Sequence, residues 1–182
     1  MDNLKFDINE IDRFLWLSSP AFKKNPGKHE KLHAEAVLIG KKTADDYPVD
    51  PSDVMATLRR YNVNEIKYFS QNGGDRAYYM TDEKNIYLNE MFISDMARLF
   101  ESLENKFFTY EKIQSALLLH ELFHHIEETI TQPTDALLSI KLKTFVPPVY
   151  RDISAFAYVN SLIPDMVCQF IDLYWLRHVT HR

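Results

Sequence analysis

The sequence predicts an α+β fold in which a small mixed or antiparallel three-stranded sheet packs with helices. Ala77–Thr81 and Asn85–Asn89 are strand-like segments on either side of a short polar turn, so they predict a β-hairpin. Ile66–Phe69 predicts one further strand. The stretch Leu117–Glu128, LLLHELFHHIEE, is apolar on nearly every side of a helix and predicts a central buried helix.

Length and composition indicate one domain with a sizeable core. The chain has 182 residues and a net charge of -5, so it offers no basic surface for nucleic acid. Its single cysteine, Cys168, excludes a disulfide framework and favours a reducing compartment. An acidic N-terminus and short apolar runs predict neither a signal peptide nor a membrane span. We expect a cytoplasmic protein whose partners are neither nucleic acids nor membranes.

The N-terminal half divides into an extension, residues 1–27, and the start of a main domain, residues 28–182. The extension predicts one short amphipathic helix from its apolar residues Ile8, Ile11, Phe14, Leu15 and Trp16. It could pack on the domain, contact a partner or cover a cleft. The main domain is predicted to begin with a helix over Lys28–Ile39 that Gly40 ends, followed by a helix from Pro51 to about Tyr61.

The C-terminal half is predicted to be helical. Asn89 can cap the helix after the hairpin, and Thr109 can cap the central helix, which ends before Thr131. Two further helices are expected, over Arg151–Leu162 and from Pro164 to about Val179. The last helix carries apolar residues, namely Val167, Phe170, Ile171, Tyr174 and Trp175. We expect them to pack on the protein's own core, and a homodimer surface is the alternative.

The central helix carries the pattern His120-Glu121-x-x-His124. Residues four apart lie one turn apart on the same helix face, so the two imidazoles can bind one zinc ion. A glutamate between them can reach a water molecule at that ion and act as a base. Two histidines and a carboxylate are costly to bury in an apolar helix unless something pairs with them, and a metal would do so. The alternative is a pair of core histidines without a metal.

A catalytic zinc takes three protein ligands, and one straight helix cannot supply the third. The downstream candidates share an acidic side chain: Asp135, Asp152 and Asp165. Asp152 is best placed, because it opens a helix of small and aromatic residues that can pack closely on the motif helix. Glu127 and Glu128 lie further along the motif helix, and we interpret them as supporting or surface carboxylates. His125 is rotated away from the ligand face, which favours a core or supporting position.

A second match to the pattern, His29-Glu30-Lys31-Leu32-His33, lies near the start of the first predicted helix. Lys28 and Lys31 place positive charge beside any cation that this segment would bind. Pro26-Gly27 also puts the segment in a first, solvated turn. We therefore interpret it as an exposed helix start.

The order of elements, then LLLHELFHHIEE and RDISAFAYVNSLIP, resembles the ImmA/IrrE-type zinc peptidases, whose IrrE N-terminal-like domain has a zincin fold. In that family a HELxH-type motif follows a β-hairpin and one helix, and a later Glu-Ala-Asn-x-Phe-Ala helix supplies the third ligand. Matching Phe156-Ala157 to that helix puts Asp152 at the acid position. A helix, Tyr47-Pro48-Val49-Asp50, a second helix and a three-stranded sheet also match. The resemblance covers roughly Lys28 to Pro164.

Three residues depart from the family pattern. Asp152 is one methylene shorter than the usual glutamate, so its helix must come closer. Phe123 stands where the family usually has glycine and could narrow the floor of the site, and Ser154 replaces asparagine. With these changes, the resemblance still implies His120, His124 and Asp152 as zinc ligands and Glu121 as the general base.

Motif and resemblance together imply a zinc-dependent endopeptidase that cleaves a specific intracellular protein, such as a transcriptional repressor. Zinc would polarise the scissile carbonyl, while Glu121 would move a proton from water to the leaving amine. One strand of the hairpin Ala77–Asn89 is expected to pair with an extended substrate, and Tyr150 or Tyr158 to stabilise the oxyanion. The alternatives are a metal-bearing module that binds a partner without cleaving it, and a toxin–antitoxin component.

Overall fold

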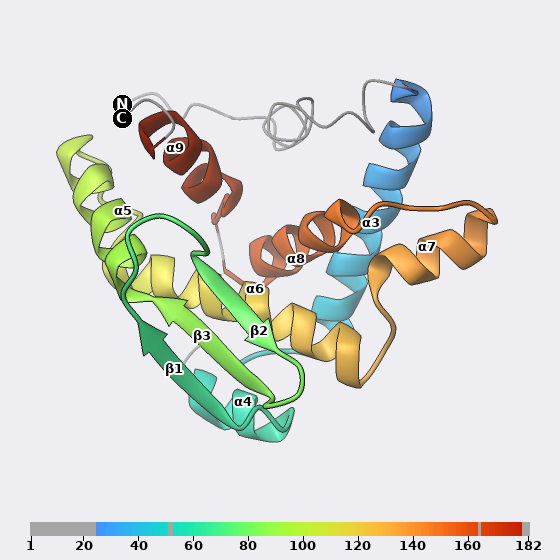
Figure 1. The fold of residues 1–182 in the computed structure, drawn as a ribbon, viewed down its shortest axis with the longest axis horizontal. Coiled ribbons are helices and arrows are strands. Elements are labelled where there is room, and N and C mark those ends of the chain that lie inside the picture. The colour runs from blue at the N-terminus through green and yellow to red at the C-terminus, as the bar shows by residue number, and fades with distance from the viewer. Residues whose placement is uncertain (1–24, 51–52, 164, 180–182) are drawn as a thin grey trace.

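The computed structural model describes residues 25–50, 53–163 and 165–179 (Figure 1). These ranges contain seven helices and one three-stranded sheet, which confirms the predicted α+β class. The elements in chain order are α3 (Pro26–Asp46), α4 (Val54–Arg60), β1 (Glu65–Phe69), β2 (Ala77–Met80), β3 (Asn85–Asn89), α5 (Glu90–Ser102), α6 (Tyr110–Thr129), α7 (Thr134–Leu142), α8 (Val149–Leu162) and α9 (Gln169–Val179).

The sheet is mixed, with the strand order β1-β3-β2. β1 runs parallel to β3, and β2 pairs with β3 antiparallel as the predicted hairpin. Tyr78 of β2 stacks on its cross-strand neighbour Tyr87, with ring centroids 4.7 Å apart. Because β2 is last in the order, one of its edges has no neighbouring strand within the described ranges.

α6 is the predicted central buried helix. Figure 1 shows it behind the sheet, and it also contacts α5 and α8. Its residues Ile113, Leu122 and Ile126 are fully buried in one apolar cluster with Ile86 and Leu88 of β3. Since apolar burial drives folding, this shared core fixes α6 against the sheet.

Two predicted caps set the starts of α5 and α6. The side-chain oxygen of Asn89 accepts the backbone N–H of Phe92 at 3.3 Å, and that of Thr109 accepts the backbone N–H of Lys112 at 3.4 Å. α6 ends at Thr129, before the Thr-Gln-Pro break, as expected.

The first helix is longer than predicted, because α3 continues through Gly40 to Asp46. This glycine permits a close helix contact and does not end the helix. A Cβ atom there would lie 2.1 Å from the backbone oxygen of Ser154 and 2.8 Å from the Cβ of Ala157. The hydroxyl of Ser154 also donates to the carbonyl of Ala36 at 2.8 Å. α3 thereby holds α8 at a fixed position.

α9 packs on the protein's own core, as expected for the side chains that the structure describes. Ile171 is buried, and the ring of Tyr174 meets that of Phe100 at a centroid distance of 5.2 Å. The homodimer alternative stays a prediction. α9 itself begins at Gln169, and the predicted start at Pro164 lies outside the described residues.

The expected helix within residues 1–24 also lies outside the described residues. α3 starts at Pro26, two residues before the expected domain boundary, and the side chain of Asn25 caps it. Within the described ranges, no helix is both long enough and apolar enough to span a membrane.

Candidate metal centre

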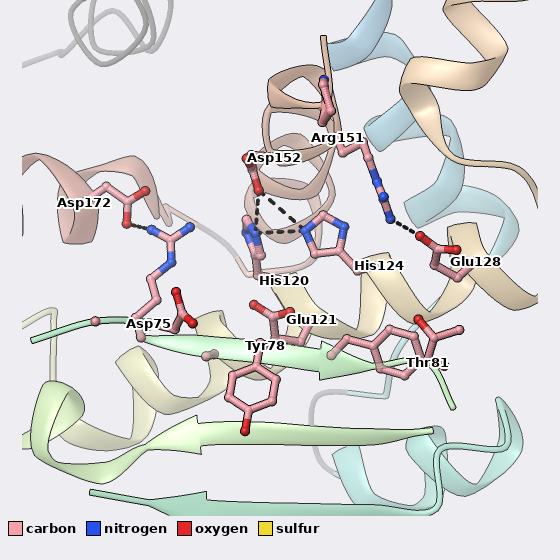
Figure 2. Close-up of a pocket in the computed structure, with 15 residues that line it drawn as sticks. Asp75, Tyr78, Thr81, His120, Glu121, His124, Glu128, Arg151, Asp152 and Asp172 are labelled. Atoms are coloured by element: carbon pink, nitrogen blue, oxygen red, sulfur yellow. Dashed lines mark hydrogen bonds and ion pairs between the residues drawn. The ribbon is translucent and has the colours of Figure 1, made fainter. Parts of the chain in front are cut away.

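Two histidines of α6 and one aspartate of α8 converge in a pocket (Figure 2). The Nε2 atoms of His120 and His124 lie 3.2 Å apart. The Oδ1 atom of Asp152 lies 3.5 Å from the first nitrogen and 3.6 Å from the second. In the part of the chain that the structure describes, these three residues form the group that could hold a metal ion. The structure thus brings together the three predicted ligands.

These spacings fit a small divalent cation. Ligand atoms about 2.0 to 2.2 Å from a tetrahedral ion lie roughly 3.3 to 3.6 Å from one another. The three donor atoms, at 3.2, 3.5 and 3.6 Å, match that arrangement closely. Two imidazole nitrogens and one carboxylate oxygen also form a donor set that leaves one position open in catalytic zinc sites.

Local structure explains how the donors meet. His120 and His124 are one turn apart in the middle of α6. Asp152 lies in the first turn of α8, where a carboxylate is stabilised by the helix dipole. α8 in turn packs against both α3 and α6, so its first turn is held over the two imidazoles.

The other acidic candidates lie elsewhere. Asp135 is in the first turn of α7, and Asp165 follows α8 with a φ of 60°. Neither belongs to the group that could hold the metal. Glu128 lines the same pocket but forms an ion pair with Arg151 (Figure 2), and it does not belong to the group that could hold the metal. Asp152 is therefore the acid that reaches the histidines.

Glu127 supports the centre from behind. Its side chain is only 2% exposed, and its Oε1 atom accepts hydrogen bonds from His124 Nδ1 at 2.7 Å and from Arg151 Nε at 2.6 Å. Its Oε2 atom accepts the backbone N–H of Thr134 at 2.9 Å. A proton on Nδ1 leaves the lone pair of His124 on Nε2, the atom that faces the other donors. Glu127 thus occupies the supporting position expected for it.

Charge is divided unequally within the cluster. Burial opposes a charge on His124, but hydrogen bonds to Asp152 and Glu127 outweigh it and raise the pKa of His124 to about 10. Burial lowers the pKa of His120 to about 4. Burial also opposes the charge on Asp152, yet hydrogen bonds from both histidines hold the pKa of this carboxyl well below its ordinary value. At neutral pH the metal-free His124 is therefore an imidazolium, and the second ring proton, on Nε2, is the one that a bound cation would displace.

Glu121 lies beside the three donors and lines the same pocket (Figure 2). It is 5% exposed, and burial raises the pKa of its carboxyl. A carboxyl with a raised pKa is better matched to taking up and returning a proton near neutral pH.

The pocket has a volume of about 650 Å³ and lies between β2 and the helices α6 and α8. Figure 2 shows β3 on one side of β2 and the histidines on the other, so the unpaired edge of β2 borders the pocket. Residues from Gly74 to Tyr79 line that border. A strand of the predicted hairpin therefore forms one edge of the pocket, and its pairing with an extended substrate stays a prediction.

The prediction that Tyr150 or Tyr158 stabilises the oxyanion is wrong. Tyr150 and Tyr158 are fully buried and do not line the pocket. The hydroxyl of Tyr150 contacts the Nδ1 atom of His29, and that of Tyr158 donates to the carbonyl of Tyr47 at 3.3 Å. Successive helical residues point about 100° apart, so nearness to Asp152 in sequence does not put a side chain on its face.

The remaining singled-out residues lie in the core. His125 is buried, as expected, with its Nε2 atom 2.6 Å from the carbonyl oxygen of Tyr61. His29 and Leu32 are also buried, so the interpretation of their segment as an exposed helix start is wrong at these two residues. Phe123 is 1% exposed and packs on Tyr158, so it fills the core and does not narrow the pocket.

Sequence reasoning missed an ion pair at one end of the pocket. Arg76, directly before β2, pairs with Asp172 of α9, and both residues line the pocket. Figure 2 labels Asp172. The guanidinium carbon of Arg76 also lies 5.5 Å from the centre of the Phe156 ring. The two charged residues are far apart in the chain and no motif spacing joins them, so no sequence pattern indicates the pair.

Comparison of the chain with protein-family models, with curated proteins and with solved structures finds no match. Membership of the ImmA/IrrE-type peptidases therefore stays a prediction from the motifs.

Proposed function

We propose that this protein is a zinc-dependent endopeptidase with a zincin-like fold, related to the ImmA/IrrE-type peptidases. The observation that carries the proposal is the position of Glu121 in the same pocket as the three donors. Binding a metal does not require a carboxylate between the two histidines, whereas hydrolysis requires a base beside the ion.

His120, His124 and Asp152 would hold the zinc ion, since their donor atoms have the spacing and chemistry that it prefers. When bound, zinc supplies Lewis-acid chemistry, polarising a carbonyl group and making water easier to deprotonate. Glu127 holds the Nδ1 side of His124, so that the Nε2 atom would be free to bind the ion, and Arg151 holds Glu127 in turn.

Glu121 takes a proton from the attacking water and delivers it to the nitrogen of the leaving amine as the peptide bond breaks. The substrate lies extended along β2, where main-chain hydrogen bonds to the unpaired edge supply affinity without requiring a particular side chain. This arrangement suits a segment within a longer chain, which makes the enzyme an endopeptidase.

The substrate that the resemblance favours is an intracellular regulatory protein, such as a transcriptional repressor. A module that binds such a partner without cleaving it, or a toxin–antitoxin component, is the competing function. The same pocket would serve either competing function, so the position of Glu121 is what favours the enzyme.

The test compares the wild type with Glu121→Gln in two measurements, zinc content and a proteome-wide screen for new peptide termini. We expect both proteins to bind about one zinc ion, and the variant to lose cleavage by about 10²- to 10⁴-fold. Zinc in both proteins without cleavage by either would favour the binding module. Absence of zinc from the wild type would remove the metal centre itself.

A further inference from the structure

The reaction needs a hydrogen-bond donor for the carbonyl oxygen that becomes negative, and the two buried tyrosines cannot supply it. The pocket offers five other donor side chains outside the metal group: Arg76, Tyr78, Tyr79, Thr81 and Arg151. Their contacts distinguish them. A donor that points away from the metal centre, or whose N–H groups already bind other carboxylates, cannot donate to the substrate carbonyl.

The hydroxyl donors are turned away or distant. The ring of Tyr78 stacks on Tyr87 and points away from the imidazoles in Figure 2. The ring of Tyr79 packs edge-on against His125, and its hydroxyl is buried. Thr81 lies near Glu128, at the opposite end of β2 from Asp172 (Figure 2).

The two arginines are held differently. Arg151 binds Glu127 through Nε and Glu128 through a terminal nitrogen, so two carboxylates share its charge. Arg76 pairs with Asp172 through Nη1. A guanidinium has five N–H donors in a fixed plane, so one such contact leaves others for a ligand.

Arg76 also lies close to the reacting groups. Its guanidinium rests over the ring of Phe156, and that ring lies 5.0 Å from the ring of His120. Side chains of Arg76 and Asp172 are only 23% and 16% exposed, which limits screening by solvent.

We propose that Arg76 donates hydrogen bonds to the carbonyl oxygen of the scissile peptide bond, and that Asp172 is its positioning residue. The inference rests on the proposed peptidase function. Charge-assisted donors fixed in advance stabilise a developing oxyanion more than the neutral carbonyl, so they act mainly in the transition state. No proton leaves Arg76, because a guanidinium stays protonated in proteins. α9 thus contributes the carboxylate of Asp172, which positions Arg76 for the reaction.

The test uses the full chain loaded with Co²⁺, and inorganic phosphate as a tetrahedral anion. The visible absorption of cobalt first shows that the metal is bound, and its change on titration gives the phosphate Kd. We expect Arg76→Gln to weaken phosphate binding at least tenfold, and Arg76→Lys and Asp172→Asn to weaken it about threefold to tenfold. Arg98→Gln, on the exposed face of α5, is the matched control and should leave the Kd unchanged.

The outcomes separate this inference from the proposed function. Equal phosphate affinity in the wild type and the Arg76 variants, or no phosphate binding to the cobalt-loaded wild type, would overturn the role of Arg76 alone. Failure of the wild type to bind cobalt would instead remove the metal centre. If Arg76→Gln does not fold, Arg76→Lys and Asp172→Asn still decide the matter, because both retain polar side chains of similar size.

Discussion

The chain contains two His-Glu-x-x-His segments that share their spacing but differ in their surroundings. On α6, His120 and His124 lie in the middle of a buried helix and face Asp152 of α8. On α3, His29 lies in the first turns, and its Nδ1 atom contacts the hydroxyl of Tyr150, also on α8. One turn of α8 thus offers a carboxylate to one segment and a hydroxyl to the other. The pattern sets the spacing of the imidazoles, and the neighbouring helix determines what they can bind.

The charged residues near the two segments also differ, and they favour cation binding on α6 and oppose it on α3. The α3 segment includes Lys31 and follows Lys28, so a cation there would meet repulsion. The α6 segment has buried carboxylates on both sides of its second histidine, Glu121 and Glu127. The four predictions that follow test this contrast.

The largest expected effect is on metal binding. His124→Ala should weaken zinc binding by about 10³-fold, since a structural zinc site provides roughly 3 to 4 kcal/mol per ligand. His33→Ala, the equivalent change on α3, should leave zinc content and affinity unchanged. Competition with a chromophoric chelator measures both. Loss of zinc from the His33 variant would show that the α3 segment also binds the metal.

The next effect concerns α3 as a packing element. Gly40→Ala should lower the free energy of unfolding by about 2 kcal/mol, because the new Cβ atom would overlap the backbone oxygen of Ser154. Gly27→Ala, on the same helix with no atom within 4 Å of the new methyl group, should cause no loss. Urea denaturation of both variants compares them. Equal stability would mean that α3 and α8 can separate without cost.

A smaller effect on zinc affinity is expected from Glu127, which binds the Nδ1 atom of His124. Glu127→Gln should weaken zinc binding about 10- to 100-fold, because a neutral amide orients His124 less strongly than the carboxylate does. Glu128→Gln is the control, since Glu128 bonds Arg151 at the edge of the pocket and should change the zinc Kd less than about threefold. The same chelator competition measures both, and equal effects would argue against orientation through Nδ1.

The smallest single step, about tenfold in affinity for each pH unit, is expected in the pH dependence of zinc binding. The raised pKa of His124, about 10, means that the metal-free cluster holds a proton at neutral pH which zinc must displace. Affinity should therefore rise about tenfold per pH unit between pH 6 and 8. Titration calorimetry in buffers of different ionisation enthalpy should count one proton released from the metal centre. Affinity independent of pH would show that His124 is neutral before zinc binds.

Much of this architecture could be predicted from local pattern. Caps at Asn89 and Thr109, the hairpin and the buried α6 follow from turn chemistry and apolar spacing, which act within a few residues. The motif spacing also places His120 and His124 on one face. A helix start and the family resemblance coincide at Asp152 and predict it as the third ligand.

Other features depend on contacts between distant parts of the chain. Gly40 resembles a helix end in sequence, but close approach of α8 explains it, and no local pattern reveals that neighbour. The tyrosines beside Asp152 face other directions because a helix turns about 100° per residue. Arg76 and Asp172 meet because α9 packs against the core beside the start of β2.

The start of α8 has one more consequence. Tyr150, Arg151 and Asp152 are consecutive, yet they contact α3, the end of α6 and the two imidazoles respectively. Inserting or deleting one residue between Val149 and Asp152 would turn these side chains by about 100° and misdirect all three together. Insertions and deletions should therefore be tolerated better in the connection from α7 than between these residues. The three contacts together fix the register of the first turn of α8 against α3 and α6.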